Sequence, residues 1–310
     1  MWLPQFHVHR FQRDMKLAED FGCQGLLGIH WRHRVVDPTA GFQSQASWNA
    51  RLTTAAYYQH YASSLARPVH AGRLAPLLEA IDREQRLMCT CPVEADDGAH
   101  QHQEFASDYD EGFVFWKGYA IGESLIASQK KTAAALHALA AATGSPAERE
   151  RLQYLSKHVG LLVPYTDAWI AASRLHQLIQ QAVQLKREGS AEEARAKMKA
   201  EGIPLWITVA TKVREVILDF QQVVSTRNDQ GTLASMHNKL VRLALVRLPA
   251  SMKEIFGELP IEVRQTQEEA VKPDSNEQSR LLLPTRPTIL FKRRVSACRR
   301  LCQVQSWRLP

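Results

Sequence analysis

The strongest constraint on the fold is a series of long segments with helical periodicity between Ser47 and Gly257. Residues 205–224, LWITVATKVREVILDFQQVV, repeat apolar side chains every three to four positions, as one packed face of a helix requires. No short-period repeat relates the segments, so a helical bundle is favoured over a solenoid. Helices are expected at residues 48–66, 70–87, 113–143, 147–187, 190–201, 204–227 and 231–257.

Capping and breaking residues indicate where these helices begin and end. Ser47 is a credible N-cap for the first of them. Pro164 is expected to kink the helix that contains it, and the polar residues 89–110 are expected to form a long loop. Glycine favours the left-handed conformation that ends many helices. Helix stops are therefore expected at Gly144, Gly189, Gly202 and Gly257.

The first 46 residues have a different character. FHVHRF (residues 6–11) is typical of a short strand or loop, residues 12–22 of a helix, and residues 25–29 of a buried strand. A loop, a helix and a buried strand in succession are typical of an α/β unit. One such unit cannot form a parallel sheet alone. Either a partner supplies the other strands, or the chain is the last part of a larger protein.

These patterns predict a mainly α protein, a helical bundle C-terminal domain preceded by a small α/β remnant of a barrel. Residues 1–46 would be the terminal α/β element of an incomplete barrel, and residues 47–260 the helical domain. Residues 261–310 would be a linker, followed by a β-like segment that could begin a further domain and by a basic tail.

The net charge of +7 comes almost entirely from the last residues. Residues 292–310 hold six Lys/Arg and no Asp/Glu, which leaves 33 basic against 32 acidic side chains over residues 1–291. A basic tail can bind polyanions, but a terminus without a selected function is the preferred interpretation. Nucleic acid is therefore not the expected partner. No apolar run reaches the roughly 20 residues that span a bilayer, and the N-terminal residues do not form a signal peptide.

Chemistry-bearing side chains gather around the expected strand. If residues 25–29 form a buried parallel strand, the side chains that follow lie at its carboxyl end, where α/β folds and barrels bind ligands. A tryptophan there can stack on a pyranose, and the arginines behind it can bind hydroxyls or a carboxylate. The alternative is that these side chains form an interface with the bundle. The predicted substrate-binding residues are His7, His9, Arg10, His30, Trp31, Arg32 and Arg34.

Two other groups of polar and aromatic residues are better explained by helix structure than by a functional site. The carboxylates of residues 108–111 precede several aromatic residues, a combination that suits glycoside hydrolysis but that the first turn of a helix also favours. Tyr165, Trp169 and His176 fall near one helix face, which is typical of a core. The sequence has no nucleophile elbow and no phosphate-binding glycine loop. Its five cysteines lack zinc spacing, so neither a metal nor a cofactor is expected.

The order of these parts resembles the C-terminal half of alpha-glucuronidases and alpha-N-acetylglucosaminidase-like glycoside hydrolases. The matching segments are AEDFGCQGLLGIHWRHR and FQSQASWNARLTTAAYYQHYASSLA, followed by a long helical region. Asn49–Ala50 stands where that pattern often has Asp–Pro. The resemblance implies a final barrel strand and a helical domain, with the catalytic carboxylates on earlier strands that this chain lacks. No catalytic residue can be assigned.

The expected function is therefore that of a carbohydrate-active, glycoside hydrolase-like protein that is truncated and inactive by itself. Its expected partner is a poly- or oligosaccharide, with acidic sugars included. The main alternative is a non-enzymatic all-α interaction or scaffold protein, which would need an exposed apolar face on residues 204–257. The resemblance leaves open whether an intact ancestor is exported.

Overall fold

The computed structural model describes residues 6–25, 37–89 and 119–271, and within these ranges it is helical, without strands. Residues 1–266 form one compact unit and residues 267–310 a second. The first unit holds nearly all of the described residues. The mainly α expectation is confirmed. The expected strand at residues 25–29 lies almost wholly outside the described residues, so the barrel remnant stays a prediction.

The unit begins with four helices of the N-terminal region: α1 (Val8–Asp20), α2 (Asp37–Ala46), α3 (Thr54–Leu65) and α4 (Pro68–Cys89). Thr53 caps α3, because its side chain accepts a hydrogen bond of 3.2 Å from the amide of Ala56. Pro76 lies inside α4.

The next part of the unit consists of three long helices: α5 (Tyr119–Ala142), α6 (Pro146–Gly160) and α7 (Leu162–Arg187). Gly189, with φ of 89°, lies just beyond α7, where glycine tolerates the left-handed conformation. The expected helix stop at this position is confirmed.

The last part of the described chain alternates α-helical and wider π-helical turns. Along the chain these are α8 (Ala191–Lys197), η3 (Met198–Gly202), α9 (Ile203–Gln221), α10 (Arg227–Met236), η4 (His237–Val241), η5 (Leu243–Arg247), α11 (Leu248–Phe256) and α12 (Ile261–Val271). Gly257, with φ of 86°, comes directly after α11 and confirms the expected stop there.

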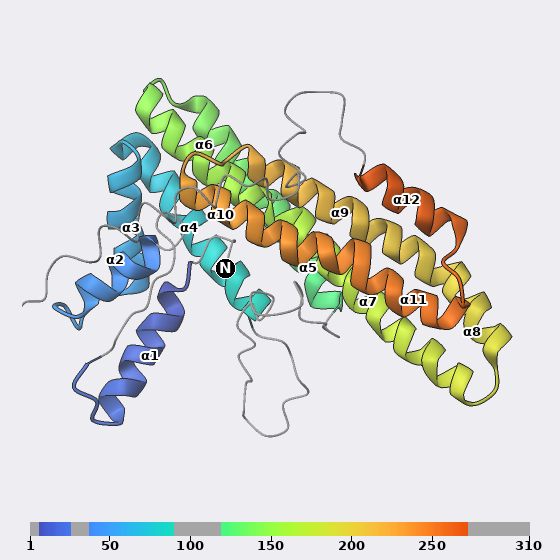
Figure 1. The fold of residues 1–310 in the computed structure, drawn as a ribbon. Coiled ribbons are helices and arrows are strands. Elements are labelled where there is room, and N and C mark those ends of the chain that lie inside the picture. Colours follow the sequence, from blue (N-terminus) through green and yellow to red (C-terminus); the bar gives the residue numbers. More distant parts are fainter. Residues whose placement is uncertain (1–5, 26–36, 90–118, 272–310) are drawn as a thin grey trace, which may run out of the picture. The chain divides into compact units, whose positions relative to one another are not determined.

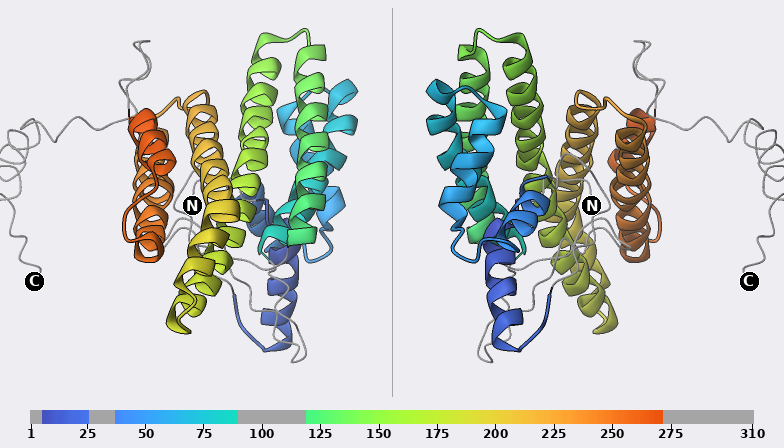
Figure 2. Two further views of the ribbon diagram at one scale, coloured as in Figure 1. Left: turned by 90° about the vertical axis from the view of Figure 1, so that its right-hand side faces the viewer. Right: turned by 90° about the vertical axis from the view of Figure 1, so that its left-hand side faces the viewer.

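The helices pack side by side in an order close to that of the sequence (Figures 1 and 2). The α3–α4 pair packs on α5, α5 on α6 and α7, α7 on α9, and α9 on the long helix that runs from α10 to α11. The helix α7 lies in the middle of this series. Residues 168–173 of α7 are buried at every position, because neighbouring helices cover this part of α7 on several sides.

The core confirms the interpretation of the aromatic residues on α7. Tyr165 is 1% exposed and Trp169 is 6% exposed, whereas His176 is only partly buried. Trp206 on α9 is fully buried, and its indole Nε1 donates a 2.7 Å hydrogen bond to the carbonyl of Ala244 in η5. A π turn interrupts the regular i→i−4 bonding pattern, so this carbonyl can accept a bond from a neighbouring helix.

Several expected boundaries are wrong. Residues 6–11 do not form an extended segment, because α1 begins at Val8 and His7 is its N-cap residue. Ser47 does not start a helix: it comes after α2, and its hydroxyl donates to the carbonyl of Gln43 at 2.8 Å. The helix break expected at Pro164 lies at Leu161, which places the proline in the first turn of α7, where its missing N–H costs little.

Two boundaries in the C-terminal half also differ from expectation. Gly202 does not stop a helix, because the chain continues from η3 into α9. Its small size serves packing instead: a Cβ at this position would lie 2.5 Å from Cε of Met198. The beginning of the expected linker, residues 261–271, is the helix α12. This segment has no internal glycine or proline to break a helix.

Candidate functional site

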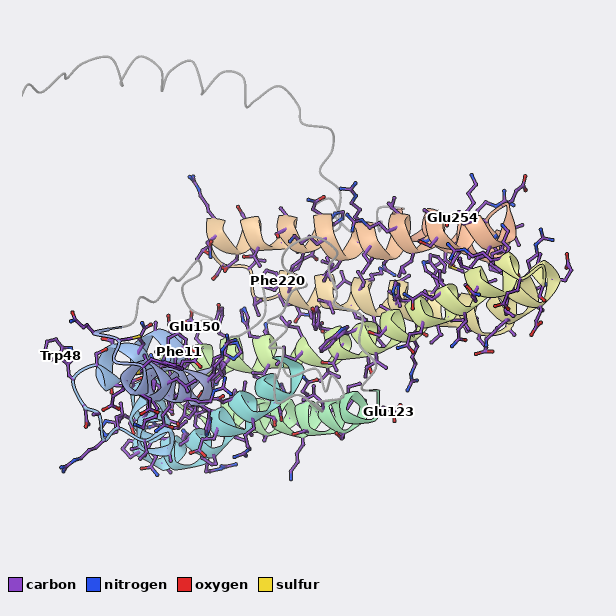
Figure 3. All side chains as sticks on the ribbon, turned by 90° about the horizontal axis from the view of Figure 1, so that it is seen from below. Phe11, Trp48, Glu123, Glu150, Phe220 and Glu254 are labelled. Carbon is purple, nitrogen blue, oxygen red and sulfur yellow. The ribbon has the colours of Figure 1, made fainter. Side chains whose placement is uncertain are left out.

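A cavity of about 360 Å³ lies where α3 and α6 meet the end of α9. Its volume falls within the range of small-molecule sites, which starts at roughly 300 Å³. Glu150 and Phe220 mark α6 and α9 in Figure 3. The lining residues are Phe6, Asp37, Tyr61, Leu65, Glu150, Arg151, Gln153, Tyr154, Leu155, Lys157, His158, Gln222, Val223, Val224 and Ser225.

Aromatic rings form one part of the cavity wall. Tyr61 projects from α3 and stacks on Tyr57, with ring centroids 6.0 Å apart and an angle of 16° between the planes. Burial, followed by the carboxylate of Asp37 and the phenols of Tyr57 and Tyr154, raises the pKa of Tyr61 above its ordinary value. The phenol therefore keeps its proton at neutral pH and can act as a hydrogen-bond donor.

A second ring cluster extends from α6. The imidazole of His158 lies 4.3 Å from the ring of Tyr154, one turn earlier on the same helix, and meets Phe220 of α9 edge-on at 5.9 Å. His158 is only 2% exposed, so it is a fixed part of the wall. The cavity thus has rigid aromatic surfaces supplied by α3 and α6.

Charged groups of both signs line the same cavity. Asp37, at the start of α2, and Glu150 of α6 supply carboxylates, and Arg151 and Lys157 supply cations. Nε of Arg151 donates a 2.9 Å hydrogen bond to the carbonyl of Leu65, at the end of α3. This bond ties α3 to α6 at the cavity, and it leaves the other guanidinium nitrogens as potential donors to a ligand.

A buried carboxylate, that of Glu148, fixes the first turn of α6, and the cavity residues Glu150 and Arg151 follow in the next turn. Glu148 is 1% exposed and accepts hydrogen bonds from Thr143 Oγ1 at 2.6 Å, from the amide of Arg67 at 3.0 Å and from Nε of Arg67 at 2.9 Å. Nδ1 of His70 lies 2.8 Å from the same carboxylate. The bond from Thr143, with those from His70 and Arg67, lowers the pKa of Glu148 to about 2 despite its burial. The corner between α3 and α4 is thereby attached to α6.

The turn after α9 is held in a comparable way. Thr226 and Asp229 form a reciprocal capping box at the start of α10, with the amide of Thr226 donating to Asp229 at 2.8 Å. The amide of Ser225, which lines the cavity, also donates to Asp229, at 3.0 Å. Burial acts to raise the pKa of Asp229, but these hydrogen bonds outweigh it and lower the pKa. The position of the cavity-lining turn is therefore well defined.

The predicted site residues of the N-terminus are engaged with helices. The amide of His7 donates to Thr39 Oγ1 on α2 at 3.0 Å, and Nδ1 of His9 lies 3.0 Å from the buried Asp82 of α4. Arg10 lies beside Asp14 on α1, with 3.5 Å between its Nε and a carboxylate oxygen. The backbone of His7 thus contacts α2 and the imidazole of His9 contacts α4, and both residues belong to the start of a helix and not to a strand.

The remaining predicted site residues, His30, Trp31, Arg32 and Arg34, lie outside the described residues, as do the carboxylates of residues 108–111. Asp37 at the cavity comes three positions after Arg34, and Phe6 at the cavity directly precedes His7. Two residues that adjoin the predicted site in sequence are therefore cavity residues.

Three cavity residues, Tyr61, Tyr154 and His158, are absent from the set of predicted site residues. Tyr154 and His158 are one turn apart in a segment expected to be helical, which indicates a shared face. The sequence gives no indication that Tyr61, more than ninety positions earlier, meets them. Among the described residues, no group of three His, Cys, Asp or Glu side chains could hold a metal ion. No described helix is both long and apolar enough to cross a membrane.

Comparisons with known proteins leave the family open: no family model, curated protein or solved structure matches the chain.

Proposed function

We propose that this chain is a saccharide-binding helical domain of a glycoside hydrolase-like protein and that it does not hydrolyse glycosides by itself. The observation that carries the proposal is the cavity between α3, α6 and the end of α9. It combines the rings of Tyr61 and Tyr154 with carboxylates and a guanidinium. An aromatic ring offers a flat apolar surface to the C–H face of a pyranose, while carboxylates and guanidinium groups bond to its hydroxyls.

The position of Asp37 gives further support. The segment that resembles the carbohydrate-active enzymes ends with Arg34, and Asp37 lies in the cavity three positions later. A saccharide held in the cavity would thus be bound close in sequence to the predicted ligand-binding segment. The resemblance implies catalytic carboxylates on barrel strands that precede the matching segments, and it assigns none of them to a residue of this sequence, which is why binding without hydrolysis is proposed.

The test is ligand-observed NMR with D-glucuronic acid, N-acetylglucosamine and glucose added in turn to the purified chain. Saturation transfer to at least one sugar is expected, and Tyr154→Ala should abolish it. The matched control is Trp48→Ala, which also removes an aromatic ring, but one that is 92% exposed and does not line the cavity. Equal transfer in both variants, or none with the wild-type chain, would refute saccharide binding at the cavity. Turnover of aryl glycosides by the purified chain would refute the absence of hydrolysis.

The alternative function, a scaffold protein, requires an exposed apolar face on residues 204–257, and the structure gives it less support. In residues 204–257 the exposed large apolar side chains are Ile207, at 38%, and Val246, at 57%. Two such side chains do not make the broad apolar face that a purely hydrophobic scaffold needs.

A further inference from the structure

The outer helix that runs from α10 to α11 has an uneven charge distribution. Between residues 230 and 253 it carries four basic side chains, Lys239, Arg242, Arg247 and Lys253, and no acidic one. The nearest acid on the N-terminal side, Asp229, is engaged in the capping box with Thr226. At the other end, the exposed Glu254 directly follows Lys253, and its backbone carbonyl accepts a hydrogen bond from Nζ of Lys186 of α7.

Two of these cations, Arg242 and Lys253, lie on an exposed face of the helix. Arg242 and Val246 are four positions apart and therefore lie on the same side of the helix. Ala250 and Lys253 continue the exposed face into α11. All four residues are exposed, whereas Lys239 and Arg247 beside them are half-buried. We call Arg242, Val246, Ala250 and Lys253 the basic row.

The opposite side of this helix is fixed against α9. Leu240, Leu243 and Ala244 are buried, and Ala244 accepts the hydrogen bond from the buried Trp206. The inner face is therefore occupied, whereas the four residues of the basic row are exposed.

We propose that the basic row is a docking surface for an acidic amphipathic helix of a partner protein. Glutamates on such a helix would pair with Arg242 and Lys253, and an apolar side chain between them would cover Val246, which is 57% exposed. Charge complementarity of this kind sets specificity and association rate. The surface is distinct from the saccharide cavity and does not depend on it.

The spacing of the cations favours a protein partner over a nucleic acid. Arg242 and Lys253 are eleven positions apart, which corresponds to about 16 Å along a helix. Duplex DNA carries one charge per roughly 1.7 Å of its axis, so two exposed cations would neutralise little of it. A helix with widely spaced glutamates matches the row better, and a nucleic acid or acidic polysaccharide has no apolar side chain to cover Val246.

The experiment is a fluorescence anisotropy titration of the full chain into a labelled, designed helical peptide with glutamates on either side of a leucine row. Saturable binding that weakens with added salt is expected. Arg242→Glu and Lys253→Glu should each weaken binding at least about fivefold. Lys131→Glu, the same charge change at an exposed position of α5, is the control and should change it less than about twofold.

Val246→Ser distinguishes a protein partner from a simple polyanion. It leaves every charge in place and should weaken peptide binding at least about threefold. The proposal is overturned if the peptide does not bind, if Lys131→Glu weakens binding as much as Arg242→Glu, or if Val246→Ser has no effect. It is also overturned if duplex DNA or heparin binds to the row more tightly than the peptide. Circular dichroism of each variant confirms that the exposed substitutions leave the helices intact.

Discussion

The N-cap of α1 makes stability depend on pH in a defined window. Burial, with a smaller contribution from the nearby charge of Arg10, lowers the pKa of His7 from 6.5 to about 4. In the unfolded chain the imidazole takes up its proton near pH 6.5, whereas in the folded chain it stays neutral until the pH approaches 4. A fall in pH through this window therefore favours the unfolded state, and stability is lost.

The two pKa values set the size of this effect. Relative to pH 8, the folded state should lose about 2 kcal/mol at pH 5 and about 3 kcal/mol at pH 4 through His7 alone. The variant His7→Gln cannot take up the proton, yet it keeps the backbone amide that donates to Thr39. The pKa of Glu148 is lowered in the folded chain, so its protonation reduces stability only below its ordinary pKa of 4.5. It therefore does not contribute to the loss of stability above pH 5.

The assay is urea unfolding of the wild-type chain and of His7→Gln at pH 8, 6.5 and 5, followed by circular dichroism. Between pH 8 and pH 5 the wild type should lose about 2 kcal/mol more than the variant. Other titrating groups, such as Glu84, whose pKa is raised by burial, act in both proteins and cancel in the comparison. Equal losses in the two proteins, or an NMR titration midpoint of His7 near 6.5, would refute the reasoning.

Buried polar contacts and side-chain exposure lead to three further predictions. Glu148→Gln should be less stable than the wild type above pH 4.5, and the wild type should lose this advantage as the pH falls from 4.5 to about 2. The free energies of unfolding of the two proteins should therefore converge near pH 2; a difference that stays constant with pH contradicts this. Trp206→Phe should cost about 1–3 kcal/mol in urea unfolding, because the buried carbonyl of Ala244 loses its donor; a change near zero would mean that the carbonyl finds water. Trp48→Ala should change stability by less than about 0.5 kcal/mol, because Trp48 is 92% exposed and lies at the margin of the α2–α3 turn (Figure 3); a loss above about 1 kcal/mol would show that the side chain is packed.

The helical part of the fold can be predicted because burial imposes its own periodicity on the sequence. The apolar positions of residues 205–224 and the aromatic residues Tyr165 and Trp169 of α7 lie in the core for this reason. Glycines predict the ends of helices less reliably, because glycine serves two structural purposes. At Gly189 and Gly257 it permits a positive φ, but at Gly202 it makes room for Met198 inside a continuing helix.

Capping residues do not predict a helix start reliably where tertiary contacts decide which helices form. Ser47 and Thr53 are both good N-cap residues, and the sequence alone does not show that α2 extends to Ala46. In FHVHRF the apolar Phe6 and Val8 alternate with His7 and His9, which is typical of an extended segment. In the structure, contacts of His7 with Thr39 and of His9 with Asp82 stabilise a helical start instead.

The cavity cannot be predicted from the sequence because its walls come from distant parts of the chain. Asp37, Tyr61 and Tyr154 belong to three different helices and Ser225 to the turn after α9, and no local pattern indicates that these segments meet. The contacts that bring them together, from Arg67 to Glu148 and from Arg151 to Leu65, join residues more than eighty positions apart. Sequence periodicity carries no information about such pairs.

The most direct test of saccharide binding is a crystal structure of the chain with the sugar that gives the strongest saturation transfer. We predict density for a pyranose ring in the cavity, in contact with the ring of Tyr61 or Tyr154 and within hydrogen-bond distance of Asp37, Glu150 or Arg151. Density for the sugar only at the exposed Trp48, or an empty cavity at saturating sugar, would contradict the proposed function.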